Sequence, residues 1–258
     1  MSDPDACGWT IFDHDPRTAR WAAAVRKAAL GVVTDPANTD GLRAGGTWFV
    51  GVDVLPNAPD GSIAGVPLAG PAIDHLHAAH ALPKEWHPAQ VSVIYPGYPQ
   101  PGAGETDAAF RFRRDRDGAH LDGLLAIGSA RARMLREPHG FVLGVPLTPA
   151  DRRAAPMVVW NGSHHVIRAA FARAFAERPE GEWPDVDLTD TYQAARRRIF
   201  ETCERQVLHV PPGGAYLVHR MMLHGVAPWA KKAEAAPEGR MIAYFRPQIP
   251  LKQWIFAP

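Results

Sequence analysis

Proline and glycine occur so often in this chain that they limit the structures it can form. The 258 residues include 25 prolines and 23 glycines, nearly one residue in five. Both residue types destabilise helix interiors, so a bundle of long helices is excluded. Their combined share stays below the roughly 25–30% that is typical of disordered low-complexity chains, and 46% of the residues are apolar. The pattern predicts a folded protein of short strands joined by many turns.

Eight short segments from residue 88 onward have the composition of β-strands. Each is rich in β-branched or aromatic residues and is bounded by turn signals such as Pro96-Gly97. Eight strands at this spacing predict a sandwich, a barrel or a jelly roll, and hence a mainly β fold with flanking helices. The segments are Gln90–Tyr95, Ala119–Leu125, Gly140–Leu147, Met157–Trp160, Val207–Val210, Ala215–His219, Met221–Ala227 and Arg240–Pro247.

Helical patterns lie before this strand region and within it. We expect a single domain over residues 1–258, in which residues 1–87 support a core at 88–250 that carries a helical insert at 163–206. The basic run Arg111–Arg116 is balanced by neighbouring aspartates and is expected to be a solvated loop or an edge strand. Thr47–Leu55 has the character of a further strand. The expected helices are Arg17–Val33, Pro71–Leu82, Val166–Glu177 and Thr189–Glu204.

The charge balance argues against two classes of function. With 28 Lys and Arg against 27 Asp and Glu, the net charge is +1, whereas nucleic-acid binders and polybasic membrane-surface proteins carry a clear basic excess. The two cysteines cannot form a disulfide framework. Residues 1–5 contain no apolar signal segment, and no apolar run approaches the roughly 18–20 residues that span a bilayer. We therefore expect a cytoplasmic protein with a small-molecule substrate; its oligomeric state cannot be inferred.

Four residues in a fixed order form a pattern that is typical of a metal site. His120 and Asp122 form an H-x-D triplet, and residues i and i+2 of an extended segment project to the same face. Such a triplet alone is expected about once by chance, but His224 and Arg240 follow it in the strand region. Two histidines and a carboxylate on one face of an octahedral ion leave three positions open, which suits non-haem Fe(II). A buried arginine nearby can bind the far carboxylate of a dicarboxylate co-substrate.

With these residues the chain resembles the Fe(II)/2-oxoglutarate-dependent dioxygenases, and its pattern is most similar to the phytanoyl-CoA dioxygenase-like branch. The matching features are the H-x-D triplet, the strand and Gly-Ser-His turn at Pro156–His164, the turn and strand at Pro212–His219, and then His224 and Arg240. They span residues 88–250. The resemblance implies a double-stranded β-helix, the cupin-like jelly roll of this family, with eight core strands.

The resemblance also implies a reaction and its cofactors. His120, Asp122 and His224 are expected to bind Fe(II), and Arg240 to bind 2-oxoglutarate, with Tyr244 on the same strand face as a wall of that pocket. The expected reaction consumes O2, releases succinate and CO2, and hydroxylates a small organic molecule whose identity the sequence does not indicate. Sixteen residues separate His224 from Arg240, more than is usual in the family, because of an insert at 231–239. Val226 occupies a position where relatives often have a hydroxyl residue.

Two alternatives from other classes stay open at this stage. The first is a metal-binding, cupin-like jelly roll without 2-oxoglutarate chemistry, either an isomerase, a hydrolase or a ligand-binding protein; such a protein has no need of Arg240. The second is a non-catalytic family member that acts as an interaction scaffold, which the complete set of metal ligands disfavours. Arg246 shares strand parity with Arg240 but lies about 20 Å further along at roughly 3.3 Å per residue, so we expect it to be outside the pocket of Arg240.

Overall fold

The side chains of one strand show how the core is divided. In the computed structural model, which describes residues 4–256, the strand that begins at Arg240 is β12 (Arg240–Phe245). Met241, Ala243 and Phe245 face a core that contains the helix α2 (Pro16–Thr34). The alternate residues Ile242 and Tyr244 face a second core between two sheets. This period-2 alternation is the pattern of a strand that is buried on both faces.

The larger sheet has seven strands, and its order shows the fold. The order is β1-β10-β7-β12-β4-β3-β2, and all neighbouring strands are antiparallel. The strands are β1 (Trp9–Phe12), β2 (Leu42–Arg43), β3 (Trp48–Gly51), β4 (Gln90–Ile94), β7 (Phe141–Pro146), β10 (Ala215–His219) and β12.

The smaller sheet faces it and has the order β11-β8-β9, made of β8 (Met157–Trp160), β9 (Arg205–Leu208) and β11 (His224–Val226). A single antiparallel bridge between His120 and His224 extends this sheet by one position. Apart from β8 and β9, which are neighbours in the smaller sheet, successive core strands from β7 to β12 alternate between the sheets, and the two sheets enclose one apolar interior. This topology is a double-stranded β-helix, so the expected jelly-roll fold is confirmed.

One expected core strand is wrong in its extent. Ala119–Leu125 does not form a continuous strand, since only His120 is bridged to the sheet and Asp122-Gly123 form a turn. Gly123 has φ of +79°, which ends the extended segment. The strand that follows, β5 (Leu124–Ile127), pairs with β6 (Ala132–Leu135) in a separate hairpin.

The basic run Arg111–Arg116 is also different from the expectation. It lies mostly in a helix, α4 (Asp107–Asp115), and not in a loop or an edge strand. The Thr106 hydroxyl accepts a hydrogen bond from the Ala109 backbone N–H, which is a helix N-cap. Thr106 as the N-cap and Asp107 in the first turn are sequence signals of a helix. The expectation of a loop or an edge strand rested on the balanced charges alone.

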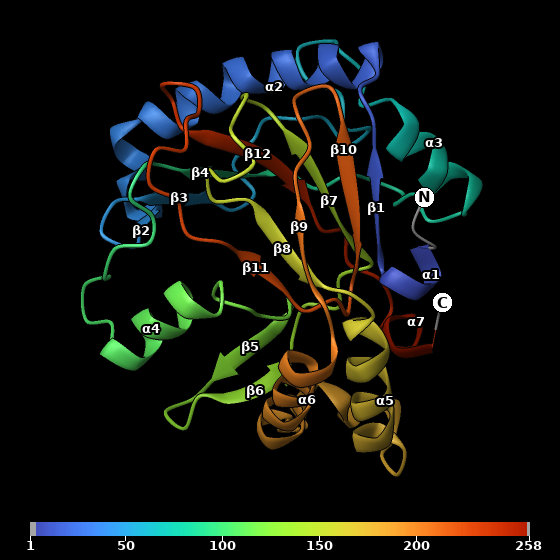
Figure 1. Ribbon diagram of the computed structural model, residues 1–258. Coiled ribbons are helices and arrows are strands. Elements are labelled where there is room, and N and C mark those ends of the chain that lie inside the picture. Colours follow the sequence, from blue (N-terminus) through green and yellow to red (C-terminus); the bar gives the residue numbers. More distant parts are fainter. Residues whose placement is uncertain (1–3, 257–258) are drawn as a thin grey trace.

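Helices cover the outer faces of both sheets (Figure 1). The long helix α2 crosses the larger sheet, and α5 and α6 lie side by side next to the smaller sheet. The expected helices at residues 17–33, 71–82, 166–177 and 189–204 are all present, with shifted ends. The remaining elements are α1 (Pro4–Cys7), α3 (Pro71–Ala78), α5 (Ser163–Phe175), α6 (Thr189–Thr202), α7 (Leu251–Phe256) and the 3-10 turns Pro36–Gly41 and Glu180–Asp185. Over residues 4–256, none of these helices is long and apolar enough to cross a bilayer.

Candidate metal centre

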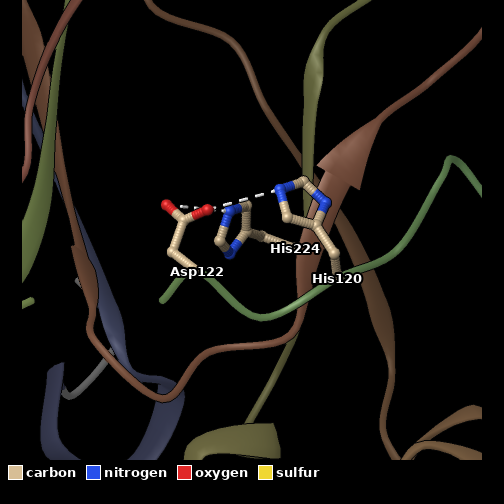
Figure 2. Close-up of side chains that lie close together, drawn as sticks. All are labelled: His120, Asp122 and His224. Atoms are coloured by element: carbon tan, nitrogen blue, oxygen red, sulfur yellow. Dashed lines mark ion pairs between the residues drawn. The ribbon is translucent and has the colours of Figure 1, made fainter. Parts of the chain in front are cut away.

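The three expected metal ligands come together where the chain enters the smaller sheet. His120 and His224 are direct partners across an antiparallel bridge, with N–H···O distances of 2.8 and 3.1 Å between their backbones. Asp122 follows two residues later at the turn and points back toward both imidazoles (Figure 2). A backbone pairing between segments 102 positions apart in the sequence therefore fixes the spacing of the two histidines.

The ligand atoms are close enough to bind one ion. One atom from each of His120, Asp122 and His224 lies within 4.8 Å of the others. The Nε2 atom of His120 is 3.4 Å from Oδ1 of Asp122, and Nε2 of His224 is 3.6 Å from Oδ2 (Figure 2). The His120 side chain is 49% exposed, while His224 and Asp122 are nearly buried. The site is thus anchored in the protein on one side and open on the other.

Backbone carbonyls orient both imidazoles. Nδ1 of His120 lies 3.0 Å from the carbonyl oxygen of Gly118, and Nδ1 of His224 lies 2.9 Å from that of Met222. Because a carbonyl only accepts, each Nδ1 carries the proton and donates it. Each Nε2 then faces Asp122: it donates to the carboxylate when the imidazole is protonated, and it presents a lone pair to a metal ion when the imidazole is neutral. Metal-binding histidines in proteins have this arrangement of a ligating nitrogen and a donating one.

The carboxylate of Asp122 is held in its charged form. Burial raises its pKa, but the charge of His224 and hydrogen bonds from both imidazoles lower it more, with a further contribution from Arg246. The net result is a pKa well below the ordinary value of 3.8. One carboxylate and two imidazole nitrogens are the donor set of the facial triad found in non-haem Fe(II) sites. These residues therefore fit a divalent transition metal, as the sequence predicts.

Arg246, which we expected to lie outside the pocket of Arg240, contacts the triad, and the sequence did not predict this contact. Its Nη1 atom lies 3.4 Å from Oδ2 of Asp122, and its Nη2 donates to the side-chain oxygen of Gln90. Arg246 therefore connects Gln90, at the start of β4, with Asp122, one of the expected metal ligands. Its strand parity with Arg240 was visible in the sequence, but its partner was not, because Asp122 belongs to a turn whose direction depends on packing.

An interior cavity of about 200 Å³ opens onto the triad. His120, Asp122 and His224 line it together with residues of both sheets, among them Trp48, Ser92, Met157 and Tyr244. Trp48 Nε1 donates a hydrogen bond of 2.9 Å to the Ser92 hydroxyl. Tyr244 thus lies at the cavity that contains the triad, and Val226 also lines it. The role of Tyr244 in binding a co-substrate stays a prediction.

Arg240 lies deeper in the barrel, outside the lining of that cavity. It begins β12 as expected and is only 6% exposed, but it lines a separate small cavity next to Tyr216. The hydroxyl of Tyr216 donates a 2.8 Å hydrogen bond to that of Tyr244, so this pair connects the two cavities. Nη1 of Arg240 is buried without a hydrogen-bond partner among residues 4–256. The sequence grouped Arg240 with the triad, whereas the structure places the two tyrosines between them.

Comparisons with known proteins find similarity in structure. No protein-family model matches the sequence, and no curated protein sequence matches it significantly. EctD from S. alaskensis, solved with 2-oxoglutarate and 5-hydroxyectoine, is 17% identical with a TM-score of 0.43, and the match covers 94% of this chain and 72% of that chain. The non-heme alpha ketoglutarate dependent epimerase SnoN from nogalamycin biosynthesis is 12% identical with a TM-score of 0.43, covering 94% of this chain and 80% of SnoN.

A third similar structure is HygX from Streptomyces hygroscopicus, solved with nickel and 2-oxoglutarate. It is 11% identical with a TM-score of 0.41, and the match covers 95% of this chain and 84% of HygX. The three structures are of proteins that bind or depend on 2-oxoglutarate (alpha ketoglutarate), the class that the sequence resembles. The narrower assignment to the phytanoyl-CoA dioxygenase-like branch stays a prediction. All three TM-scores lie below 0.5, so function has to be inferred from the side chains of this chain.

Proposed function

We propose that this protein is a non-haem Fe(II) oxygenase that depends on 2-oxoglutarate and oxidises a small organic molecule. The observation that carries the proposal is the triad itself: two oriented imidazole nitrogens and one ionised carboxylate within 4.8 Å, at the mouth of a cavity inside a double-stranded β-helix. Three protein ligands leave half of an octahedral coordination sphere for a chelating co-substrate and O2.

Each ligand has a defined task in holding the ion. His120 and His224 supply neutral nitrogens whose direction is set by their carbonyl partners. Asp122 supplies the negative charge, and Arg246 pairs with its Oδ2 atom, the same oxygen that faces His224. When bound, Fe(II) and 2-oxoglutarate would reduce O2, with one oxygen atom ending in succinate as CO2 is released and the other available to oxidise a substrate C–H bond. The surrounding barrel contributes orientation and the exclusion of water.

Arg240 is the residue proposed to bind the distal carboxylate of 2-oxoglutarate. A buried guanidinium requires a partner because its desolvation is costly, and its planar donors fit a carboxylate. The buried Nη1 of Arg240 without a hydrogen bond supports this role. A dicarboxylate that reaches from the triad to Arg240 has to pass the hydrogen-bonded Tyr216 and Tyr244, so its binding is expected to break or bypass that hydrogen bond.

The experiment is an anaerobic titration of the purified protein with Fe(II) and 2-oxoglutarate. A weak visible charge-transfer band is expected in the wild type, followed by succinate formation when air is admitted. Asp122→Ala is expected to abolish both, because it removes the charged ligand. The matched control is Asp185→Ala, which removes an exposed aspartate whose partner is Arg136 at the surface. Iron binding that survives Asp122→Ala would contradict the triad assignment.

One observation favours a second candidate function. Because Arg240 does not line the cavity of the triad, the same site also fits a metal-dependent jelly-roll protein without 2-oxoglutarate chemistry. Such a protein binds iron at His120, Asp122 and His224 but gives neither the charge-transfer band nor succinate. The titration described above therefore separates the two functions in one measurement.

A further inference from the structure

A second cavity of about 380 Å³ lies on the other side of the metal ligands. It shares His120, Asp122 and Arg246 with the interior cavity, so the two cavities meet at two of the three expected metal ligands. Its other walls come from α4, the β5–β6 hairpin and α6, which gather on one side of the barrel (Figure 1). A molecule in this outer cavity contacts the metal ligands without entering the barrel.

Cationic side chains dominate the wall of this outer cavity. Arg133 of β6 and Arg196 of α6 line it, and neither forms an ion pair with any residue in the described range 4–256. The third arginine, Arg246, is already paired with Asp122. The remaining acid of the lining, Glu137, has its carboxylate 3.3 Å from His139. Two half-buried arginines therefore line the cavity without an ion-pair partner in the described range, and Glu137 is the one acid of the lining that no arginine there pairs with.

Aromatic rings hold the guanidinium group of Arg196 in place, and hydrogen bonds hold the backbone of Arg133. Arg196 lies over the ring of Phe112 at 4.7 Å and over that of Tyr192 at 5.3 Å, which fixes its plane by cation–π contact. The backbone of Arg133 is fixed to the start of α6, because its N–H donates to the Thr189 hydroxyl at 2.8 Å.

The carbonyl of Arg133 accepts a further 2.8 Å hydrogen bond, from Leu188 N–H. The positive charges of Arg196 and Arg133 both lower the pKa of Tyr192, against burial, which raises it more. The two arginines thus approach the same tyrosine. Pre-ordered donors of this kind bind a planar or tetrahedral oxyanion with little loss of side-chain freedom.

We propose that Arg133 and Arg196 form the recognition site for an oxyanion group, a carboxylate or a phosphate, on the substrate that is oxidised at the metal. The inference rests on the proposed function and extends it by naming the substrate class. The apolar part of the outer cavity, formed by Phe112, Leu124 and Leu125, accommodates the carbon skeleton that joins this group to the oxidised position. Anionic substrate then binds outside the barrel, whereas 2-oxoglutarate binds inside it.

A neighbouring arginine on the same helix provides the matched control. Arg198 is exposed and lines a different groove, between α5 and α6. The double variant Arg133→Gln/Arg196→Gln and the control Arg198→Gln are titrated with inorganic phosphate by ³¹P NMR and with benzoate by ligand-observed ¹H NMR. The protein is loaded with Co(II) in place of iron so that no turnover occurs. Affinity for Co(II) and for 2-oxoglutarate is measured on each variant.

The double variant is expected to bind at least one of the two probes about tenfold or more weakly, since hydrogen bonds to charged groups are the strong ones. Arg198→Gln is expected to retain wild-type affinity, and all variants to retain their Co(II) and 2-oxoglutarate affinities. Preferential loss for phosphate assigns a phosphorylated substrate, and preferential loss for benzoate a carboxylic acid. Equal probe affinity in the double variant and the wild type would overturn the inference while leaving the metal and 2-oxoglutarate sites intact. Absence of Co(II) and 2-oxoglutarate binding in the wild type would instead overturn the proposed function.

Discussion

His219 makes the stability of this protein depend on pH to an extent that can be calculated. It ends β10, where its Nδ1 accepts a 3.0 Å hydrogen bond from the Met221 backbone N–H and its Nε2 lies 3.0 Å from Arg168. Burial lowers the pKa of His219 from 6.5 to about 2, and neighbouring cationic groups, first among them Arg220, act in the same direction. The folded protein therefore keeps this imidazole neutral across the mildly acidic range.

The unfolded chain binds a proton at His219 in a pH range where the folded protein does not. Below pH 6.5 the unfolded state binds a proton at His219 and the folded state does not, so the free energy of unfolding falls as the pH falls. Between pH 7.5 and 4.5 this amounts to about 2–3 kcal/mol, since the slope approaches roughly 1.36 kcal/mol for each pH unit below 6.5. The loss continues until the pH reaches the folded pKa near 2.

Urea unfolding at a series of pH values from 7.5 to 4.5 measures this difference. His219→Asn removes the titrating group, and its side-chain oxygen can still accept the Met221 N–H. We expect the variant to lose about 2–3 kcal/mol less than the wild type between pH 7.5 and 4.5. His77→Gln, on the exposed face of α3, serves as the control and is expected to follow the wild type. Parallel pH curves for His219→Asn and the wild type would refute the reasoning.

Two further predictions concern residues around the candidate site. Gly123→Ala places a Cβ 1.9 Å from a backbone carbonyl oxygen, at a residue with φ of +79°. We expect it to displace Asp122 and to weaken Co(II) binding by about tenfold or more. The control is Gly128→Ala, where φ is +68° but the new Cβ meets nothing within 4 Å, so Co(II) affinity is expected to stay unchanged. Equal affinities in these two variants would show that the turn does not position the ligand. Tyr216→Phe leaves the buried hydroxyl of Tyr244 with only the Met157 sulfur, 4.0 Å away, and is expected to lower the free energy of unfolding in urea by about 1–3 kcal/mol. The double variant Tyr216→Phe/Tyr244→Phe removes both hydroxyls, leaves neither unpaired, and is expected to lower it by less. A double variant that is less stable than Tyr216→Phe would contradict this account of the tyrosine pair.

The sequence predicted most of the metal site because its signals are local or ordered along the chain. The H-x-D triplet is a local pattern, and His224 lies in an apolar segment between turn signals. In the structure β11 places His224, and a single backbone bridge with the turn that follows it places the triplet. The sequence also predicted the two helices of the insert, since their apolar residues repeat at helical spacing. The predicted extent of the strand Ala119–Leu125, which contains the triplet, was wrong, because Gly123 at positive φ forms a turn there.

The sequence by itself predicted a mainly β fold of short strands, from its turn residues and strand patterns, and it predicted the jelly roll and three candidate metal ligands through its resemblance to a known family. Only the tertiary structure decided which arginine lies where. It placed Arg246 against Asp122, separated Arg240 from the triad by a pair of tyrosines, and turned Arg196 toward the outer cavity while Arg198 faces another groove. The physical reason is that an arginine side chain is long and flexible. Its position depends on the aromatic rings, carboxylates and cavities that the folded chain brings near it, and no local pattern encodes them.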